Sequence, residues 1–134
     1  MRDLRDLPAS WRLLTRALQI LEQTYGPDHP EIASVLDSLG RVLRELGEPS
    51  TGKQASERAL QILLRVHGHD HYQVAIVLHT QALTLRELGD AAAARQMLER
   101  ALRVFKTTLG PCHIDTLRAK RGLQELLESL PQES

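Results

Sequence analysis

The stretch HGHDH, from His67 to His71, places three histidines and an aspartate within five residues. Imidazole and carboxylate groups bind zinc and other transition metals, so this spacing could supply a metal site. A second candidate is the pair Cys112–His113, because a thiol next to a histidine can act as an activated nucleophile. Both hypotheses depend on the elements that position these side chains.

The chain repeats itself every 42 residues, and HGHDH is one copy of a repeated loop. The segments YGPDH (25–29), HGHDH (67–71) and LGPCH (109–113) share a glycine in second place and a histidine in fifth place. The motif LRELG occurs at 43–47 and again at 85–89, with the same offset. Self-similarity at a fixed period of this length indicates a repeat architecture.

This repeat favours a structural role for the histidines over a metal site. His71 has counterparts in His29 and His113, in loops that lack the other two histidines. We therefore expect these three residues to pack and form hydrogen bonds at helix starts. Asp28 and Asp70 precede two of them and are expected to cap the helix that follows.

The cysteine also lacks the surroundings of a catalytic residue. Adjacency of Cys112 and His113 in the chain is no evidence for a nucleophile and its base, and we interpret the cysteine as a free surface thiol. The glycines lie singly at turns, without the clustering of a phosphate-binding loop. The sequence predicts no catalytic residue, no metal site and no cofactor, and a protein that is not an enzyme.

The composition and the hydropathy of the chain limit which partners and which cellular compartment we expect. A chain of 134 residues fits one domain, over 1–134, and its 17 basic residues balance 17 acidic ones. The four aromatic residues leave little surface for stacking on bases. The start MRDLRDL is too charged for a signal peptide, and no apolar run could span a bilayer. We expect a cytoplasmic protein that binds neither nucleic acid nor membrane.

The apolar spacing within each period is helical. Ile32, Leu36, Leu39 and Leu43 fall on one stripe of a helix, although Gln81 interrupts the corresponding stripe in the next period. We expect an all-α fold of about five helices, in two complete antiparallel pairs flanked by half a pair at each end. The expected helices cover about 8–24, 30–47, 50–66, 72–89, 91–108 and 114–130.

Small residues recur where the helices of a pair must cross closely, at Gly40 and Ala82 in the first helix and at Ala59 and Ala101 in the second. With the turn glycines, this pattern resembles the tetratricopeptide repeat. The 42-residue period and the YGPDHPEIA loop are similar to the longer repeats of the kinesin light chain group. The resemblance covers about 8–130 and implies a right-handed α-solenoid of stacked helix pairs.

The resemblance also implies where a ligand would bind. In such solenoids the first helix of each pair lines a concave groove. The implied peptide-binding residues are Asp37, Ser38, Arg41, Arg44, His79, Thr80, Leu83, Arg86, Arg118 and Arg121. Guanidinium groups pair well with carboxylates, so we expect an acidic extended or helical peptide as the ligand. The alternative is a solvated helix face, because several of these arginines have an acidic residue four positions on.

A second function stays open, namely a structural or self-associating segment of a larger protein, such as the sensor part of a signalling ATPase. A first helix without its partner should expose Leu13, Leu14 and Leu18 unless another surface covers them. Dimerisation through the terminal helices would cover them. The sequence thus predicts a scaffold or adaptor whose interface is either the groove or its terminal helices.

Overall fold

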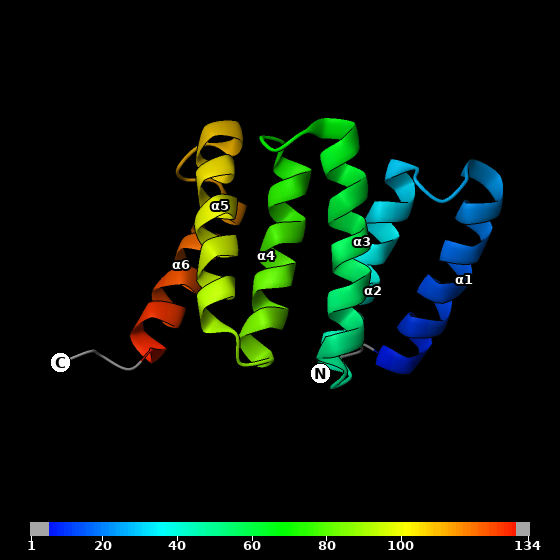
Figure 1. Ribbon diagram of the computed structural model, residues 1–134, viewed down its shortest axis with the longest axis horizontal. Helices are drawn as coiled ribbons and strands as arrows, with labels where there is room; N and C mark the ends of the chain where they lie inside the picture. The colour runs from blue at the N-terminus through cyan, green and yellow to red at the C-terminus, as the bar shows by residue number, and fades with distance from the viewer. Residues whose placement is uncertain (1–5, 131–134) are drawn as a thin grey trace. The chain divides into compact units, whose positions relative to one another are not determined.

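The computed structural model describes residues 6–130. In this part the chain is all-α, with six helices and no strand (Figure 1). The helices are α1 (Leu7–Tyr25), α2 (Pro30–Glu45), α3 (Pro49–His67), α4 (Tyr72–Glu87), α5 (Ala91–Leu109) and α6 (Ile114–Ser129). The expected class and helix positions are confirmed. The expected count of about five was one too low, because two full pairs and one helix at each end make six.

The chain divides between Val66 and His67 into two compact units. The first contains α1, α2 and all of α3 except its last residue, and the second contains α4, α5 and α6. Each unit has its own packing, and the expected single domain over 1–134 stays a prediction. Among the described residues, no helix combines the length and apolar character that a membrane span needs.

Three helices begin with a histidine cap. Nδ1 of His29, His71 and His113 accepts a hydrogen bond from the backbone N–H two residues on, at 3.1 Å in each case. The first turn of a helix has N–H groups without a partner in the helix, and such an acceptor satisfies one of them. The expected hydrogen bonding of these histidines is confirmed. The expected caps Asp28 and Asp70 were wrong, because the histidine one position later occupies the N-cap.

In the first unit α1 packs against α2, and α2 crosses α3 at a pair of glycines. A Cβ atom built on Gly52 would lie 2.8 Å from the carbonyl oxygen of Gly40. The two backbones therefore approach too closely for a side chain at this point. Ala59 on α3 is also fully buried, which confirms the small residues expected at the crossing.

In the second unit α5 packs against both α4 and α6 (Figure 1). Buried apolar side chains join the three helices, namely Ala82, Leu85, Ala94, Leu98 and Leu126. Ala101 on α5 is fully buried as expected. Gln81 is buried as well, and its Oε1 atom has no hydrogen-bond partner among the described residues. The polar residue that interrupts the apolar stripe is thus buried with an unsatisfied oxygen, which is unfavourable for this core.

Candidate functional site

The HGHDH stretch forms a stacked loop. The rings of His67 and His71 stack with their centroids 3.9 Å apart, as those of Tyr25 and His29 do at 4.3 Å in the first copy. His67 therefore takes the place of Tyr25 as a stacking partner of the capping histidine. The part of the chain that the structure describes holds no group of three or more His, Cys, Asp or Glu side chains that could bind a metal ion. Cys112 is an exposed free cysteine, as the sequence predicted.

The cap of α4 is coupled to the protonation state of His71. Partial burial lowers the pKa of His71, and the neighbouring His67 lowers it further. Both effects favour the neutral imidazole. Only an unprotonated Nδ1 can accept the hydrogen bond from the N–H of Gln73. Protonation of His71 would therefore remove the cap.

Four of the predicted peptide-binding residues lie on α2 in the first unit. Asp37 is buried, Ser38 and Arg44 are half-buried, and Arg41 is exposed. Nη2 of Arg41 donates a hydrogen bond to Oγ of Ser38 at 3.3 Å, and its Nε lies 3.7 Å from Oδ2 of Asp37. Ser38 and Arg41 also line a cavity of about 180 Å³ between α1 and α2, together with Leu7, Ser10, Val42 and Glu45. The first unit thus brings Asp37, Ser38 and Arg41 together.

Four further predicted residues lie on α4 in the second unit. Arg86 is exposed, whereas His79 and Leu83 are half-buried. Thr80 is buried, and its hydroxyl donates a hydrogen bond to the carbonyl oxygen of Ile76 at 3.2 Å. The Thr80 side chain therefore bonds to its own helix.

The last two predicted residues, Arg118 and Arg121, are exposed on α6. Nη1 of Arg118 lies 3.9 Å from Oδ1 of Asp115 in the same helix. Helix α6 approaches α4 at His79, because a Cβ atom built on Gly122 would lie 3.7 Å from Nε2 of that histidine. The second unit thus brings the predicted residues of α4 and α6 onto neighbouring helices.

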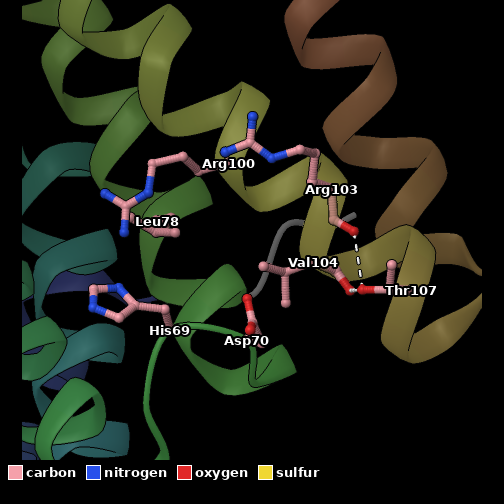
Figure 2. A pocket seen from close by; sticks show the side chains of 7 residues that line it. All are labelled: His69, Asp70, Leu78, Arg100, Arg103, Val104 and Thr107. Carbon is pink, nitrogen blue, oxygen red and sulfur yellow. Dashed lines mark hydrogen bonds between the residues drawn. The ribbon is translucent and has the colours of Figure 1, made fainter.

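A cavity of about 420 Å³ in the second unit lies outside the predicted groove (Figure 2). Its lining comes from the loop before α4, from α4 and from α5, namely His69, Asp70, Leu78, Arg100, Arg103, Val104 and Thr107. This cavity was not predicted from the sequence, because the resemblance implies binding only on the first helices. A signal was present, since Arg100 follows Arg58 by 42 residues while Glu22 does not recur in that register.

The pattern of the tetratricopeptide repeat matches residues 2–51 and 51–107, which is well over half of the chain. The chain belongs to the tetratricopeptide repeat family. Its fold class, the right-handed α-solenoid of antiparallel helix pairs, is the one that the sequence predicted. Tetratricopeptide repeats are generally non-catalytic modules for protein–protein interaction. No curated protein matches the chain in sequence.

Solved structures share this fold. The nearly identical tetratricopeptide-like repeats of a Podosopora anserina protein described as a kinesin light chain superpose with a TM-score of 0.83 at 19% identity, over 91% of this chain and 58% of that one. A variant of those repeats with one substitution gives 0.82 at 19% identity, over 90% and 57%. The BtubC (BKLC) protein of P. vanneervenii gives 0.68 at 18% identity, over 96% and 61%. This tetratricopeptide chain therefore spans less than two thirds of each of these structures.

Proposed function

We propose that this tetratricopeptide protein is a non-catalytic interaction module that binds an acidic peptide or partner helix through arginines on its first helices. Membership of the family supports a protein partner. One observation carries the acidic preference: α6, with exposed Arg118 and Arg121, lies next to α4 at His79. A ligand along these two helices would meet the guanidinium groups of Arg86, Arg118 and Arg121. Such a module would serve as a cytoplasmic scaffold or adaptor, without nucleic acid or membrane as partner.

The predicted residues would play different parts in this site. Arg86, Arg118 and Arg121 are exposed and would pair directly with carboxylates of the ligand. Asp37 and Thr80 are buried, so they would support the surface from below. In the first unit Asp37 holds the Nε side of the Arg41 guanidinium, and this contact would orient the arginine for a ligand.

Two neighbouring residues on α6 provide a matched test. Arg121 and Lys120 are both exposed cations on the same helix, and only Arg121 belongs to the predicted groove. We expect Arg121→Glu to weaken binding of a fluorescein-labelled oligoglutamate peptide about tenfold or more, the equivalent of about 1.4 kcal/mol. Lys120→Glu makes the same change of charge and should have a much smaller effect.

Fluorescence anisotropy at two salt concentrations measures both variants. Added salt should weaken binding to the parent protein, because exposed charges are screened over about 8–10 Å near physiological ionic strength. Equal losses for Arg121→Glu and Lys120→Glu would show that only the overall charge matters. An undiminished affinity after Arg121→Glu would place the interface elsewhere.

A second candidate function, self-association through the terminal helices, is favoured by their exposed apolar side chains. Ile20 on α1 is 51% exposed, whereas its counterpart Ile62, 42 residues on, is 2% exposed. Leu127 on α6 is 40% exposed, and its counterpart Leu85 only 5%. Helix α1 occupies the place of a second helix in a pair and α6 that of a first helix. Each therefore lacks the partner that the other could supply.

The leucines expected to be exposed on α1 fit this candidate in part. Leu13 is 71% exposed, but Leu14 and Leu18 are half-buried against the rest of the first unit. If α1 of one chain packs on α6 of the next, the contact is head-to-tail and leaves a free helix at each end. Mass should then rise with concentration beyond that of a dimer, whereas a symmetric homodimer would stop at two chains.

Sedimentation equilibrium of the parent and of Leu127→Glu tests this candidate. Leu88 provides a control, because it is also 40% exposed but lies at the end of α4. Leu127→Glu should reduce the mass to that of one chain, and Leu88→Glu should leave the assembly unchanged. A mass of one chain for the parent at all concentrations would contradict self-association and would leave the peptide-binding proposal intact.

A further inference from the structure

In the first copy of the repeat, arginines tie the loop before α2 to α3. Nη2 of Arg58 donates hydrogen bonds to Oε2 of Glu22 at 2.7 Å and to the carbonyl oxygen of Pro27 at 3.1 Å. Nη1 of Arg65 lies 3.1 Å from Oδ2 of Asp28. Both guanidinium groups therefore have a carboxylate partner in this unit.

The second copy keeps part of this set and loses the rest. Forty-two residues on, Arg100 and Asp70 stand at the places of the first arginine and the loop aspartate. In the sequence register, Leu64 on α3 of the first unit stands at the place of the glutamate, and Thr107 stands at that of the second arginine. Arg103 adds a guanidinium where the first copy has a glutamine. Among the described residues of the second unit, Arg100 and Arg103 form no side-chain ion pair, so this unit has two cations without the carboxylate that the first unit provides.

These two arginines line the cavity of about 420 Å³ (Figure 2). Leu78 of α4 and Val104 of α5 are buried and form the apolar part of the cavity lining. Thr107 offers a ligand little, because its hydroxyl already donates to the backbone carbonyl oxygens of Arg103 and Val104, each at 3.1 Å. The polar groups left for a ligand are the two guanidiniums, the imidazole of His69 and the carboxylate of Asp70.

The charges of the cavity select the kind of ligand. Two guanidinium groups attract an anion, and their attraction is stronger at a partly buried position such as that of Arg100 than in open water. The carboxylate of Asp70 lies in the same cavity, so two guanidinium groups and one carboxylate leave one positive charge, which a singly charged group balances. A carboxylate therefore fits this set better than a phosphate dianion.

We propose that this cavity binds one aspartate or glutamate side chain of a protein partner, with Arg100 holding the carboxylate as Arg58 holds Glu22. The apolar stem of that side chain would lie on Leu78 and Val104. The inference rests on the proposed function only in taking a protein as the partner. The cavity shares no residue with the predicted groove, so an experiment can contradict one proposal without contradicting the other.

An NMR titration of the full ¹⁵N-labelled chain tests the proposal with three probes: acetyl-Leu-Glu-amide, its glutamine analogue and inorganic phosphate. We expect the Nε–Hε signals of Arg100 and Arg103 to shift saturably with the glutamate peptide, in the millimolar range that one charge pair supports. The glutamine analogue should cause no shift. Tighter binding of phosphate would overturn the assignment to a carboxylate.

The variants Arg100→Gln and Arg95→Gln provide the matched control. Both residues lie on α5, but Arg95 pairs with Glu99 at 3.3 Å and does not line the cavity. Arg100→Gln should weaken the peptide-induced shift of Arg103 about tenfold, and Arg95→Gln should not change it. Equal effects of the two variants would overturn the site. Shifts at Arg121 on the groove without shifts at Arg100 would also overturn it, and would leave the groove proposal standing.

Discussion

The close crossing of α2 and α3 gives a sharp test of the packing in the first unit. In Gly52→Ala the new Cβ atom would lie 2.8 Å from the carbonyl oxygen of Gly40, whereas ordinary contacts begin at 3.4 Å. The two backbones would have to separate by about 0.6 Å, because neither a carbonyl group nor a Cβ atom can rotate away. The second unit has Ala82 and Ala94 at the equivalent places, so its crossing already accommodates two methyl groups.

Two opposing terms set the size of the effect. Overpacking of a tight interior site costs about 1–3 kcal/mol, while alanine is favoured over glycine in a helix by about 1 kcal/mol. Gly52→Ala should therefore destabilise the protein by about 0–2 kcal/mol. Gly122 on α6 offers the opposite case, because its Cβ would meet only side-chain atoms of His79 and Leu98 at 3.7 Å. Gly122→Ala should stabilise the protein by about 1 kcal/mol.

Thermal unfolding followed by circular dichroism compares the two variants. The difference of about 1–3 kcal/mol between them corresponds to roughly 3–15 °C in Tm for a chain of this length. Both variants replace glycine by alanine within a helix, so the comparison cancels the helix propensity and isolates the crossing. If Gly52→Ala proved as stable as Gly122→Ala, the close approach of α2 and α3 would be refuted.

Three further tests address other features of the fold. Gln81→Leu should stabilise the protein by about 1–2 kcal/mol in urea titrations, because it removes a buried amide oxygen that lacks a partner; an unchanged midpoint would mean that the amide is satisfied. The pKa of His71 in the folded protein lies below its ordinary value of 6.5. The unfolded chain therefore binds more protons than the folded one in this pH range. The free energy of unfolding should fall as the pH drops from about 6.5 through the folded pKa. His71→Asn keeps a capping acceptor that does not titrate, and Tm measured from pH 8 to pH 5 should then depend less on pH; an identical pH profile would contradict the role of this histidine. Ala101→Leu on α5 should lower the free energy of unfolding by about 1–3 kcal/mol, because the larger side chain overpacks a buried site. Ala92→Leu, at an exposed place on the same helix, should change it by less than about 0.5 kcal/mol. Equal stabilities of these two variants would contradict the helix crossing.

The helices could be predicted from the sequence because the repeat supplies the same signal several times. Each 42-residue period combines an apolar stripe with a turn glycine, and an error in one copy is corrected by the next. The helix starts were predicted less well. Asp28 and His29 are adjacent and both carry an acceptor suited to capping, so the sequence could not tell which of them holds the N-cap. In the structure the histidine occupies the N-cap, and the aspartate pairs with Arg65 instead.

The cavity in the second unit could not be predicted for a different reason. The ion pair between Arg58 and Glu22 joins residues 36 positions apart, on two helices, and no local pattern reveals it. The change from Glu22 to Leu64 one period later becomes informative only once the ion pair in the first unit is known. In the first copy the chain itself supplies a carboxylate, Glu22, for the arginine. In the second copy the corresponding residue is Leu64, which has no carboxylate. Repeats have similar packing needs, so a charged side chain that keeps its place while its internal partner does not is a candidate for binding a partner outside the chain. In this protein Arg100 is such a side chain, and it lies in a cavity that contains none of the arginines of the predicted groove.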